Sequence, residues 1–271
     1  MTTASPIPAA ERGHVTQLRV IRSEWIKLCS LRSTVFALLA AVVAMIGLGF
    51  LFSYFTAARW DRLPPEERLV FDPTMVSLRG LYLAQLAIGV LGVLVVSGEY
   101  ASGMIRASLS AVPRRLPVLW AKALVYAAVA WLLMTCAALA AFLLGQTALA
   151  GHHLQTSLSS PGVLRGVLGT GLYLTVVGLI GVALGALLRS TAGGITAVFA
   201  LLLVLPVLAQ ALPSSWYDTI NPYLPSTAGQ SLIHVQQQPH TAAPWTGFAV
   251  FCLYALAALV CAAVALKRRD A

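Results

Sequence analysis

Long apolar runs alternate with short polar stretches along most of this chain. A helix that crosses a bilayer needs about 20 predominantly apolar residues. Six runs approach or exceed that length, at residues 34–54, 80–96, 119–144, 163–188, 193–212 and 245–266. The pattern therefore predicts an all-α integral membrane protein with six transmembrane helices.

The stretch before the first run has the pattern of a helix that lies on a membrane surface. Residues 1–13 are rich in Thr, Ala and Pro and are expected to form a disordered tail, with residues 14–271 as a single domain. One arc of the predicted helix is apolar and contains Val15, Leu18, Ile21, Trp25 and Leu28. Another arc is polar and contains Arg19, Ser23 and Lys27, with Val20 off the pattern. This amphipathicity predicts an interfacial helix with Trp25 at headgroup depth.

The most polar interruption between two runs is segment 97–122, SGEYASGMIRASLSAVPRRLPVLWAK. A helix is expected over residues 99–112, because proline at position 113 lacks an N–H and clashes with a preceding helical turn. Glu99 and Arg106 are seven residues apart, so they would share one face of that helix. The following loop and the start of the third span hold further basic residues, Arg114, Arg115 and Lys122, the last as an interfacial anchor.

The remaining connections differ in character. Loop 55–79 balances four arginines with four acids, and Pro64, Pro65 and Pro73 are expected to oppose regular structure there. Segment 213–244 has one charge but many apolar side chains, so it is expected to re-enter the membrane edge or to cap the bundle. Pro206 is expected to kink the fifth span. Gly181 and Gly185 form a small-residue face for close helix packing, which favours dimerisation only slightly.

Charge distribution predicts which side is cytoplasmic. Only 10% of the residues are charged, and the formal net charge is +9. Thirteen of the 18 Lys and Arg residues fall in the N-terminal segment, the segment after span two, the turn after span four and the C-terminal tail. These segments are expected to be cytoplasmic, with both termini inside. The positive net charge is explained better by basic loops beside anionic lipid than by binding to nucleic acid.

Several classes of activity are disfavoured by residues that the sequence lacks. The middle of each apolar run contains no Asp, Glu, Lys, Arg or His, which argues against a proton-coupled carrier. There is no phosphate-binding loop of the G-x-x-x-x-G-K-[ST] type, so the chain is not expected to hydrolyse ATP. The four cysteines form no C-x-x-C pair, and neither a metal nor a cofactor is expected. If this chain moves a solute, the energy must come through its cytoplasmic face from another chain.

Three segments resemble the permease subunits of ABC-2 type transporters. SEWIKLCSLRSTVFALL, from Ser23, is similar to the elbow helix that precedes their first span. SGEYASGMIRASLSAVPRRLPVLWAK is similar to their segment after span two, with its Glu-Tyr, Gly-x-Ile-Arg, Leu, Pro-x-Arg and Ala-Lys. LPSTAG, from Leu224, is similar to the region before their last span.

The resemblance implies an architecture like that of type V exporters, in which two permeases, identical or related, pair with two separate ATPase subunits. It implies a coupling helix that contacts the ATPase and contains Glu99, Tyr100, Gly103, Arg106 and Leu109, followed by Pro113, Arg114 and Arg115. Glu24, Trp25 and Lys27 would belong to the elbow helix. The turn at 189–193 would be a smaller second contact. Such a protein lies in the cell membrane and exports a solute, here one of hydrophobic or amphipathic character.

Two other functions are compatible with parts of this pattern. A non-transporting scaffold or sensor partner of a regulatory ATPase would need the same cytoplasmic contact but no cargo path. A secondary carrier would move its solute with a proton gradient and without ATP, and it fits the apolar span centres poorly.

Overall fold

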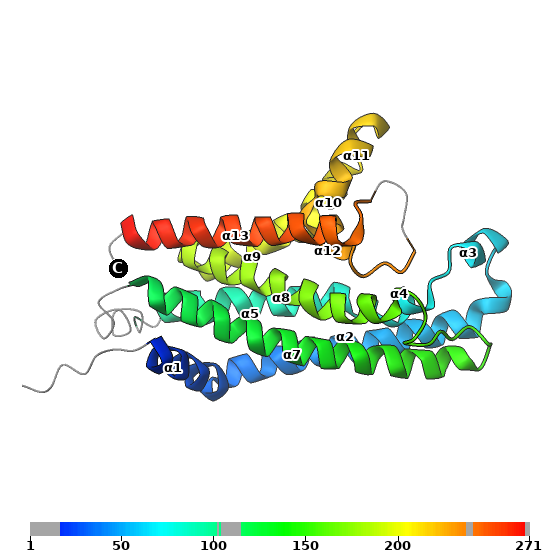
Figure 1. Ribbon diagram of the computed structural model, residues 1–271, viewed down its shortest axis with the longest axis horizontal. Helices are drawn as coiled ribbons and strands as arrows, with labels where there is room; N and C mark the ends of the chain where they lie inside the picture. Colours follow the sequence, from blue (N-terminus) through cyan, green and yellow to red (C-terminus); the bar gives the residue numbers. More distant parts are fainter. Residues whose placement is uncertain (1–16, 102, 104–114, 237–240, 269–271) are drawn as a thin grey trace, which may run out of the picture.

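The computed structural model describes residues 17–101, 103, 115–236 and 241–268. Six helices in this part of the chain are long and apolar enough to cross a membrane, which confirms the predicted six-span α-helical fold. Five of them run side by side as a bundle (Figure 1): α2 (Arg32–Arg59), α5 (Leu81–Ala101), α7 (Arg115–Ala150), α8 (Val163–Leu188) and α13 (Pro244–Arg268). The remaining span, Thr191–Ala209, is built from α9 (Thr191–Phe199), η2 (Ala200–Val204) and α10 (Leu205–Ala209).

Helix α8 forms the centre of the bundle. Eighteen of its 26 residues are buried, and it packs against α5, α7 and α13. By contrast, α2 has only six buried residues in 28, and large apolar side chains such as Phe36 and Val43 face outward. An exposed apolar helix surface of this kind is stable only in lipid or against another protein. The burial pattern thus agrees with a membrane-embedded bundle.

Glycines allow α5 and α8 to approach to backbone contact. A methyl group built on Gly92 of α5 would overlap the carbonyl oxygen of Gly178 in α8. A methyl on Gly181 would in turn overlap the carbonyl oxygen of Gly89, and one on Gly185 would lie 2.8 Å from that of Val93. The small-residue face predicted in the fourth span therefore packs within this chain.

The fifth span is broken at its middle. The π-helical turn η2 ends two residues before Pro206, which lies in the first turn of α10. A π-turn and a proline are both recognised causes of helix bending. Beyond this break, α10 and α11 (Ser214–Ile220) lean away from the bundle in Figure 1.

The long apolar segment before the last span contains short helices. They are α11, η3 (Asn221–Tyr223) and α12 (Pro225–Gln230), and α12 is largely buried against α13. Gln230 Nε2 lies 3.4 Å from the hydroxyl of Tyr173, which donates to Gln85 Oε1 at 2.5 Å. This polar chain joins α12 to α8 and α5, so the predicted capping of the bundle is confirmed for α12.

The first loop is more regular than expected. Pro65 and Pro73 do not oppose helix there but begin α3 (Pro65–Leu69) and α4 (Pro73–Ser77), because the first turn of a helix does not use the missing N–H. Asp72 caps α4 by accepting from the Thr74 N–H at 2.8 Å. Helices α2 and α7 also extend beyond the predicted span ends, to Arg59 and Ala150.

Candidate functional site

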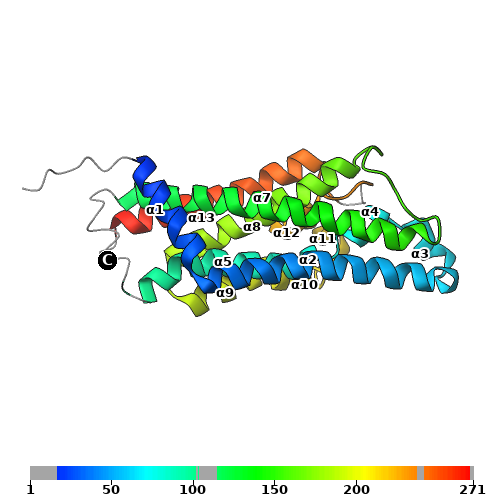
Figure 2. The same ribbon diagram turned by 90° about the horizontal axis from the view of Figure 1, so that it is seen from below.

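One end of the bundle brings together the segments that carry the predicted contact residues. Helix α1 (Gln17–Ser30) lies across this end and packs on α7 and α2. Figures 1 and 2 place the end of α5, the start of α7 and the end of α13 at this same end of the bundle. We call this the elbow end of the bundle.

Four charged side chains form a closed circuit of ion pairs at the elbow end, which we call the ionic ring. Its members are Glu24 and Lys27 of α1, Glu99 of α5 and Lys122 of α7. The amine of Lys27 lies 2.7 Å from Glu24 Oε1 and 3.0 Å from Glu99 Oε1. The amine of Lys122 lies 2.5 Å from Glu24 Oε2 and 2.9 Å from Glu99 Oε1. Each lysine therefore bridges the elbow helix to the end of the second span.

The ionic ring is largely shielded from solvent. The side chains of Glu24, Glu99 and Lys122 are 4%, 6% and 5% exposed, and that of Lys27 is 31% exposed. Removing one partner from a buried pair leaves an uncompensated charge, and this costs far more than the intact pair contributes. The ring thus restricts α1 to positions in which all four charges stay paired.

Electrostatics keep Lys27 protonated. Burial alone would lower the pKa of its amine, but hydrogen bonds and attraction from Glu24 and Glu99 outweigh burial, so the pKa lies above its ordinary value. The stability that this shift contributes is present below the unfolded pKa and is lost only as the pH rises through the folded pKa. Since an ordinary lysine titrates near about 10.4, the ring retains this charge throughout the neutral range.

A second connection joins α5 to the turn between α8 and α9. The guanidinium of Arg189 lies over the ring of Tyr100, 5.1 Å from its centroid, within the range of a cation–π contact. Arg189 adopts a left-handed backbone with φ of 52°, which ends α8. One turn before Tyr100, the Ser97 hydroxyl accepts a hydrogen bond from Thr191 at 2.9 Å. The turn at 189–193 is therefore attached to the end of the second span.

The structure brings part of the predicted contact set together. Glu24, Lys27 and Glu99 meet in the ionic ring, while Trp25 points outward and is exposed. Gly103 adopts φ of 73°, a left-handed conformation that suits glycine after a helix end. The other predicted positions, Arg106, Leu109, Pro113 and Arg114, lie outside the described residues.

Three sequence-based expectations about this end are wrong. Glu99 and Tyr100 do not begin a separate helix, because α5 continues to Ala101. Arg115 begins α7 and is not in the preceding loop. Lys122 is not an interfacial anchor that reaches toward the membrane surface, because two carboxylates hold its amine inside the bundle.

The buried face of α1 also differs from the predicted apolar arc. The buried residues are Val20, Glu24 and Leu28, spaced by four, and Val20 packs on Val118 and Ala121 of α7. A glutamate between two apolar residues on one helical stripe was the available signal for a buried acid. The sequence pattern did not indicate the burial of Glu24, because Leu18 and Trp25, which are exposed, fit the apolar arc better.

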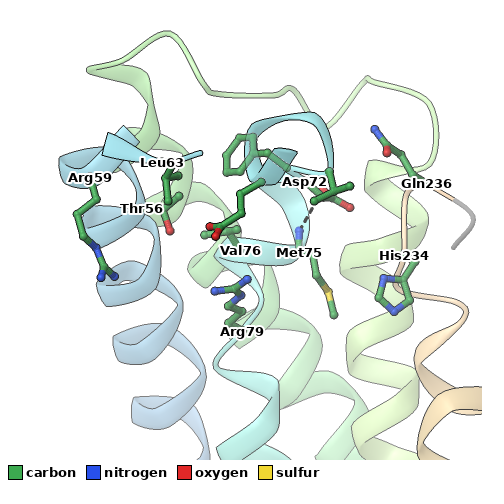
Figure 3. Close-up of a pocket in the computed structure, with 12 residues that line it drawn as sticks. Thr56, Arg59, Leu63, Asp72, Met75, Val76, Arg79, His234 and Gln236 are labelled. Carbon is green, nitrogen blue, oxygen red and sulfur yellow. Dashed lines mark hydrogen bonds between the residues drawn. The ribbon is translucent and has the colours of Figure 1, made fainter. Parts of the chain in front are cut away.

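The opposite end of the bundle contains a cavity of about 680 Å³ that both charged and apolar side chains line. Figure 3 shows Arg59 and Arg79 toward one side of it, with Asp72 and His234 toward the other. The Arg79 guanidinium also lies 5.6 Å from the ring centroid of Phe52. The cavity carries both signs of charge at the end of the bundle away from the ionic ring.

Acidification should destabilise the fold around His234, which lines this cavity. Burial lowers the pKa of the His234 imidazole, and Arg165 lowers it further against the opposing effect of Asp72. The folded protein therefore prefers the neutral imidazole. Stability is complete above the unfolded pKa of about 6.5 and is lost as the pH falls through the lower folded pKa. The melting temperature of the wild type should decrease between about pH 7 and pH 5 more than that of His234→Gln.

The matched control for this prediction is His152→Gln, since His152 is exposed in another loop. It should keep the wild-type pH dependence of melting. Equal pH dependence in His234→Gln and the wild type would show that this imidazole is not the group responsible.

Within the described ranges, no group of three or more His, Cys, Asp or Glu side chains gathers as potential metal ligands. The arrangement at the elbow end is suited to transmitting movement between helices. It joins an interfacial helix, two spans and a turn through charged and polar contacts.

A known protein family covers most of the chain. The family described as "ABC-2 family transporter protein" matches residues 74–271. The match includes Glu99, Lys122 and the turn after α8, while Glu24 and Lys27 precede it. A search of curated proteins found no significant match.

Proposed function

Because the chain belongs to the ABC-2 transporter family and is a multi-pass membrane permease, we propose that it is the membrane-spanning subunit of an ATP-driven exporter. A separate ABC ATPase subunit hydrolyses the ATP, and this chain contributes no catalytic residue. Two permease chains, identical or related, pair to form the transporter. Residues 14–271 act as one domain within each permease.

The ionic ring is the observation that carries this proposal. The segment between α5 and α7 contains the predicted ATPase contact, with Arg106, Leu109, Pro113 and Arg114. Glu99 precedes this segment and pairs with Lys27 of the elbow helix, while Lys122 follows the segment and pairs with Glu24 of the same helix. A movement of this segment is therefore transmitted through the ionic ring to two spans and to the elbow helix.

The turn at 189–193 serves as the second contact with the ATPase. The Arg189–Tyr100 and Thr191–Ser97 contacts support this role, because they join the turn to the same end of α5 that carries Glu99. Movement at either contact would then be shared between α5 and α8, which touch through their glycine faces.

The elbow end faces the cytoplasm in this proposal, with both chain termini on that side of the cell membrane. The basic residues support this orientation, since thirteen of 18 lie in segments that reach this end. The cavity near His234 then faces the opposite side of the membrane. Trp25, exposed on α1, lies among lipid headgroups, where an amphipathic ring is favoured.

The exported solute is hydrophobic or amphipathic. The centres of the apolar runs contain no Asp, Glu, Lys, Arg or His that could offset the charge of a strongly polar solute in a low-dielectric path. The exposed apolar surface of α2 and the outward lean of α10 and α11 are available for the partner permease or for lipid.

Charge reversal at Arg106 tests the coupling role. The variant Arg106→Glu should reach the membrane and bind its ATPase, yet lose most of the ATPase stimulation that accompanies transport in proteoliposomes. Arg22→Glu, a reversal at an exposed position of α1, is the matched control and should behave as wild type. Wild-type coupling in Arg106→Glu would contradict the assignment of the contact segment.

Vesicle flux separates export from the scaffold alternative. An exporter should move an amphipathic solute across the membrane with ATP when the permease and its ATPase are reconstituted together. A scaffold or sensor partner would co-purify with an ATPase but would show no ATP-dependent flux.

A further inference from the structure

A cavity of about 280 Å³ adjoins the ionic ring. All four ring residues line it, together with an apolar group that consists of Leu28, Leu31, Leu94, Val95 and Val125. The cavity therefore has a charged wall of both signs beside an apolar wall. Leu31 and Ser33 are exposed, so the cavity meets the outer surface where α1 turns into α2.

The geometry points to a phospholipid site that recognises a headgroup with a primary ammonium and a phosphate, as in phosphatidylethanolamine. We infer this from the two charges that the ring presents together. An ammonium matches Glu24, and a phosphate matches Lys122, while the first carbons of the acyl chains match the apolar wall. Sites for drug-sized ligands usually have volumes of about 300–1,000 Å³. This cavity is slightly smaller, so it suits a headgroup more than a complete lipid.

The ring residues retain the capacity to bind such a headgroup. A carboxylate offers about four acceptor positions, and Glu24 receives one hydrogen bond on each oxygen from the two lysines. A lysine ammonium has three donors, and Lys122 directs two of them to Glu24 and Glu99. A bound zwitterion could therefore pair with the ring without displacing an existing partner.

The lining also discriminates between common zwitterionic headgroups. A primary ammonium donates three hydrogen bonds, whereas the quaternary ammonium of choline donates none and is typically recognised by aromatic rings. Among the residues that the structure describes, the side chains that line this cavity include no aromatic ring. The site should therefore prefer ethanolamine over choline.

Gly98 provides a way to fill the cavity without disturbing the ring. It lines the cavity, and a Cβ atom added there would meet no neighbouring atom within 4 Å. A leucine at this position would occupy the space that the headgroup needs. Gly47 of α2 is the matched control, because a Cβ atom added there also meets nothing within 4 Å and the residue does not line the cavity.

Lipid retention in native mass spectrometry tests the inference on the full-length chain, without ATP or an ATPase. The protein would be purified from nanodiscs that contain equal amounts of phosphatidylethanolamine and phosphatidylcholine with matched acyl chains. The wild type and Gly47→Leu should retain the ethanolamine lipid with about tenfold preference, as expected when charge-assisted hydrogen bonds are made by one headgroup only. Gly98→Leu should lose this preference.

A second variant protects the test against misfolding of Gly98→Leu. Ser33→Trp places a large side chain at the exposed rim of the cavity and should reduce the preference in the same direction. Equal retention of the two lipids by the wild type would overturn the inference, as would an unchanged preference in both cavity variants. Either result leaves the proposed export function untouched, because retention is measured without transport.

Discussion

Lys122→Met is expected to lower the free energy of unfolding by about 3–5 kcal/mol, which is the usual effect of removing one partner from a buried ion pair. Lys122 is 5% exposed and holds both Glu24 and Glu99 within 2.9 Å. Without it, Glu24 and Glu99 would both lose a cationic partner inside a bundle that offers them little water. Methionine keeps most of the side-chain volume, so the expected effect comes from charge and not from a cavity.

Unfolding in detergent, followed by circular dichroism during titration with a denaturing detergent, would measure this loss. Lys267→Met is the matched control, because Lys267 is exposed near the end of α13 at the same end of the bundle. It should change stability by no more than about 0.5 kcal/mol. A loss in Lys122→Met no larger than in this control would mean that the ionic ring does not hold α1 in place.

A double variant distinguishes the ring from an unrelated effect of the substitution. Glu24→Gln combined with Lys122→Met restores charge balance, with Lys27 and Glu99 still paired at 3.0 Å. The double variant should therefore be more stable than the sum of the two single losses predicts, since residues in one ionic network do not act additively. Simple additivity would argue that Glu24 and Lys122 are not coupled.

Gly92→Ala should destabilise the bundle by about 3 kcal/mol, at the upper end of the usual range for overpacking. The added methyl group would overlap the carbonyl oxygen of Gly178 on α8. A flexible side chain could move away at little cost, but a helix backbone can yield only if the two helices separate. Because α8 is the most buried helix of the bundle, that separation would disturb packing on several sides.

Gly47→Ala is the matched control for this substitution. It makes the same chemical change in a membrane-spanning helix where the new methyl group meets no atom within 4 Å. Alanine has the higher helix propensity, so this variant should match the wild type or gain up to about 1 kcal/mol. Similar melting temperatures for the two alanine variants would contradict the backbone contact between α5 and α8.

Helix α1 shows what a sequence pattern can predict and what it cannot. Its amphipathicity indicated a helix before the first span, and the structure confirms that helix at Gln17–Ser30. The same pattern did not reveal that Glu24 is buried, because amphipathicity separates apolar from polar residues and identifies no partner for an acid. Glu24 can be buried only because Lys122, 98 residues away in sequence, lies beside it. A pattern within α1 cannot identify a partner that lies in another helix.

The ends of the second and third spans show the same limit. Helix periodicity suggested a face shared by Glu99 and Arg106, since the two residues are seven apart. The structure pairs Glu99 with Lys27 and Lys122, which come from two other helices, while Arg106 lies outside the described residues. Charge pairs within one helix follow from spacing, whereas pairs between helices depend on how those helices pack.

The sequence by itself determined the number of spans, their approximate limits and the family resemblance. These properties depend on apolar length and on short motifs, because a bilayer requires about 20 apolar residues and internally satisfied backbone hydrogen bonds. Only the tertiary structure decided that Glu24, Lys27, Glu99 and Lys122 form one ring and that the α5 and α8 glycines touch. Buried charges need partners within a few ångströms, and helix approach depends on the atoms of the facing helix. Both are relations between distant segments, which only packing brings together.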